Sequence, residues 1–189
     1  MLPNGSDSQF LGYRGLARLN EMRENCEGEL FRNREKIGFI GFGKMAKAIW
    51  SGMKQKDLVS PSQISISVKS RESGTDIEQN WWLKVVSSAQ VLSQSDVILF
   101  CVKPQGIQDF LSSLPPINNP NKLIISVLAG TPLSTFDTYF NQAGLVRAMP
   151  NTPARLQEGI TALAYHPRTS PEQKALAQAL FQACGQTID

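Results

Sequence analysis

The sequence predicts an α/β fold with a doubly wound, mostly parallel sheet. Three observations lead to this class. From residue 36 onwards, short apolar segments rich in isoleucine, valine and leucine alternate with segments of helical periodicity. A glycine-rich turn joins the first apolar segment to the first helical one. A proline-bounded polar segment at 147–154 follows a later strand, where open α/β sheets place their ligands.

The individual elements follow from apolar periodicity and from helix-start signals. Ile107, Phe110 and Leu111 recur at helical spacing. Thr131 and Ser170, each followed by a proline, are the expected caps of two later helices. We expect strands at 36–41, 64–68, 83–86, 96–102, 122–128, 145–149 and 160–165, and helices at 44–56, 76–82, 88–95, 105–114, 132–140 and 171–183.

Composition excludes several classes of protein. The 189 residues suffice for one domain, or for one domain with an appendage, and 19 basic against 16 acidic residues leave a charge of only +3. This surplus argues against nucleic acid or a membrane surface as a partner, and no apolar run is long enough for a spanning helix. Cys26, Cys101 and Cys184 fit neither a disulfide framework nor a zinc pattern. We therefore expect a soluble cytoplasmic protein with free thiols and no metal site.

Residues 1–35 differ in composition from the rest of the chain. Their arginines are balanced by glutamates, whereas a mitochondrial presequence is poor in acids, so a targeting role is not expected. Leu11, Leu19 and Met22 suggest part of a helix, but their spacing is imperfect. The prediction is a flexible amino-terminal extension at 1–35, followed by a single domain at 36–189.

The turn Gly41-x-Gly43-x-x-Ala46 predicts a dinucleotide site. Gly41 permits a tight turn, Gly43 lets the backbone approach a pyrophosphate, and Ala46 lets the helix pack close to the strand. The helix amino terminus then offers free amides to the phosphates. Such a turn is a weak signal alone, but it lies here between a predicted strand and a predicted helix. This context favours a Rossmann-type dinucleotide-binding domain over a simple tight turn.

The end of the second predicted strand favours NADPH over NADH. An NAD site usually has a carboxylate there, which accepts from the ribose 2′-hydroxyl. This chain has Lys69, Ser70 and Arg71, which can donate to a 2′-phosphate. Glu72 follows and weakens the inference, and a solvated turn is the alternative.

Two further strand ends face the same edge of the predicted sheet. Cys101-Val102-Lys103-Pro104 ends the strongest strand, and Pro104 stops that strand so that Lys103 points toward the cleft. The next strand ends at 127–132, where small residues would let the backbone lie close against one side of a nicotinamide. An ordinary strand-to-helix turn explains residues 127–132 equally well.

The segment 147–154 supplies Arg147, Asn151 and Thr152 from what we expect to be a rigid loop, because Pro150 and Pro153 interrupt regular structure. Asn151 can both donate and accept, which suits a carboxamide or a small polar substrate. His166, the only histidine, has no evident partner and is expected on the surface. No catalytic side chain is predicted, since hydride transfer relies on the cofactor's own chemistry.

Together these residues resemble the pyrroline-5-carboxylate reductase family, whose members catalyse the last step of proline synthesis. The resemblance covers about residues 37–185. It rests on Ile37-Gly38-Phe39-Ile40-Gly41-x-Gly43-x-Met45-Ala46, Val102-Lys103-Pro104, Ala129-Gly130 and Arg147-x-Met149-Pro150-Asn151-Thr152-Pro153, of which the last is the most specific.

The resemblance implies reduction of a cyclic imine by NAD(P)H, with hydride delivered to the C=N carbon to give L-proline. It also implies roles for particular residues. The pyrophosphate would be held by Ile40, Gly41, Phe42, Gly43, Lys44 and Met45, the adenosine ribose end by Lys69, Ser70 and Arg71, and the nicotinamide side by Lys103, Pro104, Leu128 and Ala129, with Asn151 near the reacting ring.

This sequence departs from the family pattern in its length. Family members continue into a helical carboxyl-terminal domain that makes the dimer and anchors the substrate carboxylate, whereas this sequence stops at Asp189. We therefore expect exposed apolar surface where that domain would dock, and a homo-oligomer in a full-length form. The alternatives to a reductase are a non-catalytic NADP-binding module and another Rossmann dehydrogenase. The proline-bounded signature argues against the latter.

Overall fold

The computed structural model describes residues 35–189, and the predicted extension at 1–35 lies almost wholly outside them. The described part contains one 8-stranded sheet. Its strands are β1 (Ile37–Ile40), β2 (Ile64–Ser67), β3 (Lys84–Val85), β4 (Val97–Phe100), β5 (Leu123–Ser126), β6 (Gly144–Pro150), β7 (Gly159–Tyr165) and β8 (Gly185–Ile188). The helices are α2 (Lys44–Gln55), α3 (Arg71–Trp81), α4 (Ser88–Gln94), α5 (Ile107–Ser112), α6 (Leu133–Asp137) and α7 (Pro171–Gln182), with 3₁₀ turns η1 (Pro61–Gln63) and η2 (Thr152–Leu156).

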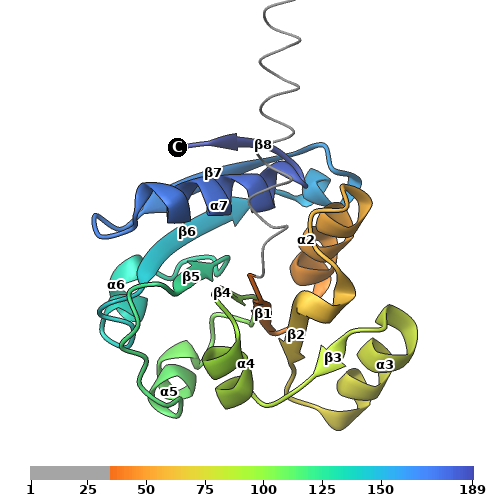
Figure 1. The fold of residues 1–189 in the computed structure, drawn as a ribbon, viewed down its shortest axis with the longest axis horizontal. Helices are drawn as coiled ribbons and strands as arrows, with labels where there is room; N and C mark the ends of the chain where they lie inside the picture. The colour runs from red at the N-terminus through yellow and green to blue at the C-terminus, as the bar shows by residue number, and fades with distance from the viewer. Residues whose placement is uncertain (1–34) are drawn as a thin grey trace, which may run out of the picture.

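The strand order is β3-β2-β1-β4-β5-β6-β7-β8, and it confirms the predicted doubly wound, mostly parallel sheet. Only the β6–β7 pair is antiparallel. The chain builds outward from β1 to β3 on one side and from β4 on the other, so the order reverses between β1 and β4. Figure 1 shows the strands crossing the molecule from β8 to β3. The crevice at such a reversal, beside the carboxyl ends of the strands, is where sheets of this kind bind ligands.

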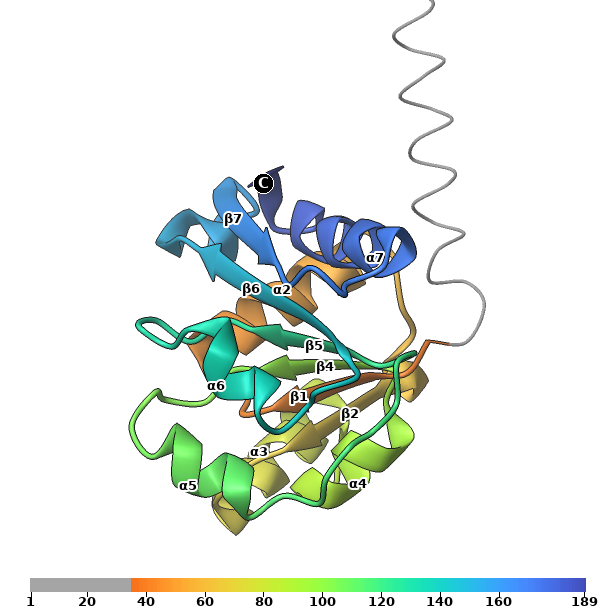
Figure 2. The same ribbon diagram turned by 90° about the vertical axis from the view of Figure 1, so that its left-hand side faces the viewer.

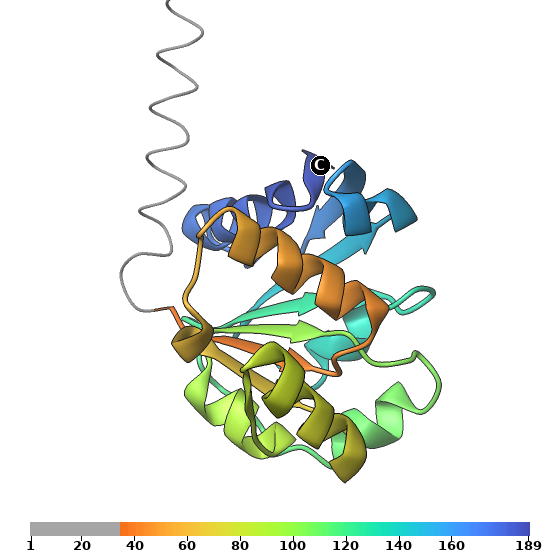
Figure 3. The same ribbon diagram turned by 90° about the vertical axis from the view of Figure 1, so that its right-hand side faces the viewer.

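Helices cover the two faces of the sheet and bury two apolar clusters. One cluster joins the sheet to α2, α3 and α7 and includes Phe39, Trp50 and Phe181. The other lies under α4, α5 and α6 and includes Phe100 and Phe136. Figures 2 and 3 show these helices on opposite sides of the strands. The strands β1, β4 and β5 are buried on both faces, as parallel strands between two helical layers must be.

The start of α3 and the cap of α6 differ from the prediction for local reasons. Helix α3 begins at Arg71 and not at residue 76, because the Ser70 hydroxyl accepts a hydrogen bond from the amide of Ser73 and caps the helix. Helix α6 has Pro132 at its N-cap position, so the prediction of Thr131 as the cap was wrong. The Thr131 hydroxyl lies instead 3.5 Å from the carbonyl oxygen of Ala129, to which it donates. Ser170 caps α7 as predicted.

The segment predicted as a rigid loop at 147–154 is mostly regular structure. Strand β6 continues through Arg147 and ends only at Pro150, opposite Thr161 of β7. Pro153 then lies in the first turn of η2, where its missing amide donor costs nothing. The strand therefore ends at the first proline, as predicted, but the residues after it form a 3₁₀ turn and not the irregular loop that was expected. Strand β8, which pairs in parallel with β7, was not predicted either.

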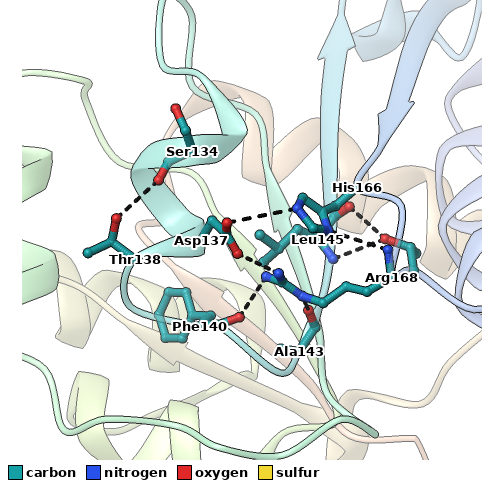
Figure 4. A network of polar contacts seen from close by, with 9 residues as sticks. Ser134, Asp137, Thr138, Phe140, Ala143, Leu145, His166 and Arg168 are labelled. Atoms are coloured by element: carbon teal, nitrogen blue, oxygen red, sulfur yellow. Dashed lines mark hydrogen bonds and ion pairs between the residues drawn. The ribbon is translucent and has the colours of Figure 1, made fainter.

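Arg168 holds the β7–α7 connection against the α6–β6 connection. Its guanidinium donates to the Asp137 carboxylate, to the carbonyl of Ala143 at 2.6 Å and to the carbonyl of Phe140 at 2.9 Å. His166 Nε2 lies 3.8 Å from the same carboxylate. Figure 4 shows the network. The expectation that His166 has no partner was wrong, because the fold brings Asp137 to it from a distant part of the sequence.

We expect Arg168→Met to lower the free energy of unfolding by about 2 kcal/mol, because it removes three charge-assisted hydrogen bonds that are partly buried. Urea denaturation followed by circular dichroism measures the change. Arg71→Met, at an exposed position on α3, is the matched control and should change stability by less than about 0.5 kcal/mol. Equal stability of the two variants would contradict the role of this network.

Candidate functional site

A cleft of about 1500 Å³ opens at the carboxyl ends of β1, β2 and β4. It therefore lies at the point where the strand order reverses. Figure 2 shows the loops after β4 and β5 projecting from the same edge of the sheet. The cleft is lined by Ile40, Gly41, Phe42, Gly43, Lys47, Ser67, Val68, Lys69, Ser70, Glu72, Ser73, Asp76, Ile77, Ser88, Cys101, Val102, Lys103, Gln105, Gly106, Ile107 and Phe110.

The glycine turn lies tightly against two neighbouring strand ends. Gly41 has φ +88°, a conformation that residues with side chains rarely adopt. A Cβ atom at Gly41 would lie 2.9 Å from the backbone of Cys101 and from the side chain of Val102. The Gly41 amide donates to the carbonyl of Ser67 at 2.8 Å. Only glycine fits this position, which fixes the entry of the chain into α2.

Gly43 presents open backbone to the cleft. It is the N-cap residue of α2, makes no side-chain cap, and a Cβ atom built on it would meet nothing within 4 Å. The first turn of α2 contains no acidic residue. The unpaired amides and the positive end of the helix dipole therefore face space that an anion can enter. This arrangement fits the pyrophosphate of a dinucleotide.

The three residues directly after Gly43, Lys44 to Ala46, do not line the cleft with their side chains. Ala46 is fully buried, which agrees with a role in close packing of α2 on the sheet. Met45 packs against the same apolar cluster, and Lys44 is exposed. Any contribution of these three residues to phosphate binding would come from their backbone amides.

The end of β2 carries charges of both signs. Of the predicted residues, Lys69 and Ser70 line the cleft. The acidic residues Glu72 and Asp76, which were not predicted as site residues, line it as well. The side chain of Arg71 is exposed and lies outside the lining residues. The Ser70 hydroxyl is already engaged, since it donates to the Ser73 hydroxyl at 2.7 Å.

The end of β4 forms the opposite wall. Cys101, Val102 and Lys103 line it, whereas Pro104 does not. Gln105, which precedes α5, and Phe110, on α5, extend this wall. Burial raises the pKa of the Cys101 thiol, so this group stays protonated near neutral pH. A protonated, desolvated thiol is a wall of the cleft and a poor nucleophile.

Three further predicted residues, after the strands beyond β4, also lie outside the cleft lining. Leu128 is buried, Ala129 is exposed after β5, and Asn151 is exposed after β6. The Asn151 side-chain oxygen accepts a hydrogen bond from the amide of Ile160 at 3.0 Å, so it also holds the start of β7. Arg147 lies within β6, and its buried Nε atom has no hydrogen-bond partner among residues 35–189.

Sequence reasoning missed several residues of the cleft. Ser67 ends β2 and Ser88 begins α4, and their hydroxyl oxygens lie 2.7 Å apart. Lys47 comes one helical turn after Gly43 and reaches the cleft from α2. A strand end and a helix start are signals that could have identified the serines. The sequence holds no comparable signal for Lys47, because the position of its side chain depends on how α2 packs against α3.

An exposed apolar face lies at the carboxyl end of β6 and continues onto β7 and β8. Along β7, buried and exposed residues alternate, and the exposed Ile160 and Ala162 lie beside Met149 of β6 and Ile188 of β8. Ile160 is 47% and Ile188 57% exposed. These side chains agree with the expectation of exposed apolar surface.

Residues 35–189 offer neither a metal site nor a membrane-spanning helix. Residues 35–189 hold no group of three histidine, cysteine or carboxylate side chains placed to bind a metal ion. None of their helices has both the length and the apolar content to cross a bilayer.

Comparisons with known proteins agree on one family. The family model described as NADP oxidoreductase, coenzyme F420-dependent, matches residues 36–130. Pyrroline-5-carboxylate reductase of Arabidopsis thaliana is 33% identical over 154 residues, which are 81% of this chain and 56% of that protein. The enzyme of that name from Escherichia coli is 32% identical over 157 residues, with 80% and 57% covered. The chain thus spans a little over half the length of these relatives.

Solved structures show the same relation. A 1-pyrroline-5-carboxylate reductase from Streptococcus pyogenes has a TM-score of 0.72 and 33% identity, over 82% of this chain and 57% of that chain. A Plasmodium falciparum pyrroline carboxylate reductase with NADP bound has a TM-score of 0.70 at 24% identity, which supports the fold.

Proposed function

This chain belongs to the family of NADP oxidoreductases, coenzyme F420-dependent, and from that membership we propose that it is the cofactor-binding part of a pyrroline-5-carboxylate reductase. The observation that carries the proposal is the cleft itself, where the open backbone of Gly43 lies at the amino terminus of α2. The relatives of about 33% identity that bear this enzyme name support the choice of substrate.

In this proposal the chain binds and orients the cofactor and excludes water. When bound, a reduced nicotinamide would supply the hydride for the C=N carbon of the cyclic imine, and uptake of one proton at nitrogen would give L-proline. The amides at the start of α2 hold the pyrophosphate, and Lys69 lies at the ribose end. Val102 and the protonated Cys101 form an apolar wall at the end of β4, and Lys103 adds a positive charge beside them. Asn151 would lie near the reacting ring.

We expect this chain alone to bind cofactor with little turnover. Holding the substrate carboxylate is what positions the imine, and a loss of such positioning costs a large part of the rate. The apolar face with Ile160 and Ile188, and the unpaired Nε of Arg147, support docking of a further polypeptide and a homo-oligomer in a full-length form. We place the protein in the cytoplasm, where Cys101 and Cys184 remain free thiols.

The test is pyrroline-5-carboxylate-dependent oxidation of NADPH by the chain and by the chain mixed with the carboxyl-terminal half of a relative. Activity of the mixture supports a reductase. Tight NADPH binding with no activity in either sample would favour the second candidate, a non-catalytic NADP-binding module.

We expect Lys69→Glu combined with Arg71→Glu to weaken NADPH binding at least about 10-fold and NADH binding less than about 3-fold, because a carboxylate repels a 2′-phosphate. Titration by cofactor fluorescence measures both. Lys54→Glu, exposed at the far end of α2, is the control and should leave both affinities unchanged. An equal loss for the two cofactors would defeat the preference for NADPH.

A further inference from the structure

We propose that Lys47 recognises the 2′-phosphate of NADPH, leaving an ion pair with Asp76 to do so. The proposal rests on the proposed function, because it assumes that the cleft binds a dinucleotide. It gives Lys47 of α2 a role that the pattern at the end of β2 does not suggest.

The position of Lys47 places it at the ribose end of the cleft. It lines the same hollow as Lys69, Ser70 and Ser73. Its ammonium lies 3.8 Å from the Asp76 carboxylate and 5.0 Å from the centre of the Trp81 ring, both on α3. Lys47 therefore bridges α2 and α3 across the part of the cleft next to the end of β2.

The contacts of Lys47 are easily given up. The side chains of Lys47 and Asp76 are 37% and 50% exposed, and ion pairs this open to water contribute little to stability. A phosphate monoester carries close to two negative charges at neutral pH and offers several acceptor oxygens. A lysine with a weak carboxylate partner and a flexible stem can exchange that partner for the phosphate.

The carboxylates at this end of the cleft would oppose phosphate binding unless a cation offsets them. Glu72 and Asp76 both line this end, and each would repel a 2′-phosphate. Lys69 alone does not balance them, and the exposed Arg71 side chain lies outside the lining. Lys47 both offsets the charge of Asp76 and supplies a hydrogen-bond donor. Its removal would therefore weaken phosphate binding in two ways, by the loss of the donor and by the uncompensated repulsion from Asp76.

Adenosine 2′,5′-bisphosphate and 5′-AMP are suitable probes, because they differ only in the 2′-phosphate. We expect Lys47→Gln to weaken the bisphosphate about 10-fold and to leave 5′-AMP within about 2-fold. Asp76→Asn should tighten the bisphosphate. In the Asp76→Asn background, Lys47→Gln should still weaken it, since a direct contact is lost. Isothermal titration on the full chain measures all four proteins.

Fluorescence gives a second readout that does not depend on activity. Binding of the bisphosphate should change the emission of Trp81, because the ammonium leaves the ring face. The change should be absent with 5′-AMP, in Lys47→Gln and in Trp81→Phe. Lys54→Gln, which removes an exposed cation at the far end of α2, is the matched control and should keep both the affinity and the signal.

Three results would overturn the proposal. An equal loss of bisphosphate and 5′-AMP in Lys47→Gln would show that the residue does not read the phosphate. No effect of Lys47→Gln in the Asp76→Asn background would show that it only neutralises Asp76. If the unmodified chain binds neither NADPH nor the bisphosphate, the proposed function fails, whereas normal NADPH binding with no effect of Lys47→Gln defeats this inference alone.

Discussion

Replacing Gly43 with serine is expected to weaken NADPH binding about 100-fold while leaving the stability of the fold unchanged or slightly higher. Gly43 is the N-cap residue of α2 at φ −80°, which serine adopts readily, and its Cβ would meet nothing within 4 Å. Serine is a favoured N-cap, so its hydroxyl would accept from an amide of the first turn. The hydroxyl would then fill the space that a phosphate oxygen needs, and it would engage the backbone amide that would otherwise donate to that oxygen.

The opposite signs of the two effects make this variant informative. Thermal unfolding and NADPH titration on the same sample give both quantities. Gly41→Ala is the contrasting variant: with φ +88° and backbone of Cys101 at 2.9 Å, it should lose stability as well as binding. Unchanged NADPH affinity in Gly43→Ser would show that the start of α2 does not hold the phosphates.

Phe100→Ala is expected to lower the free energy of unfolding by about 3–5 kcal/mol, the usual cost of removing a buried phenylalanine. Phe100 ends β4 at the reversal of strand order and is 0% exposed. Its ring lies 5.1 Å from that of Phe136 and 5.8 Å from that of Phe140, centre to centre. Neither α6 nor the sheet can close over the hole without moving the other.

Urea unfolding followed by circular dichroism measures this loss. A loss of that size is a large part of the total stability of a typical domain, so the variant should also unfold well below the temperature of the parent. Phe110→Ala is the control, since this ring is only half-buried on α5, and it should cost about 1–2 kcal/mol. Equal costs would contradict the central place of Phe100 in the core.

The sequence allowed prediction of those elements whose signal is local. Helix α7 has a serine cap, a proline in its first turn and an apolar stripe, and it was placed within one residue. Strands β1, β4 and β5 are short apolar runs buried on both faces. Strand β8, Gly185–Ile188, has no such signal, because half of its residues face solvent and its pairing with β7 comes from tertiary packing.

The candidate site divides in the same way. Gly41, Gly43 and Lys103 follow strand ends, where a motif reveals them, and all three line the cleft. Lys47 and Asp76 meet because α2 packs against α3, and no spacing in the sequence reports that contact. His166 shows the same limit, since its partner Asp137 comes from α6. Motifs therefore identify the phosphate end of the cleft better than its walls.

The most direct test of the account is titration of this chain with NADPH and with NADH, followed by fluorescence. We expect saturable binding of one NADPH per chain, and weaker binding of NADH, because NADH lacks the 2′-phosphate that the lysines at the end of β2 and on α2 would contact. Absence of saturable binding of either cofactor would contradict the assignment of the cleft as a dinucleotide site.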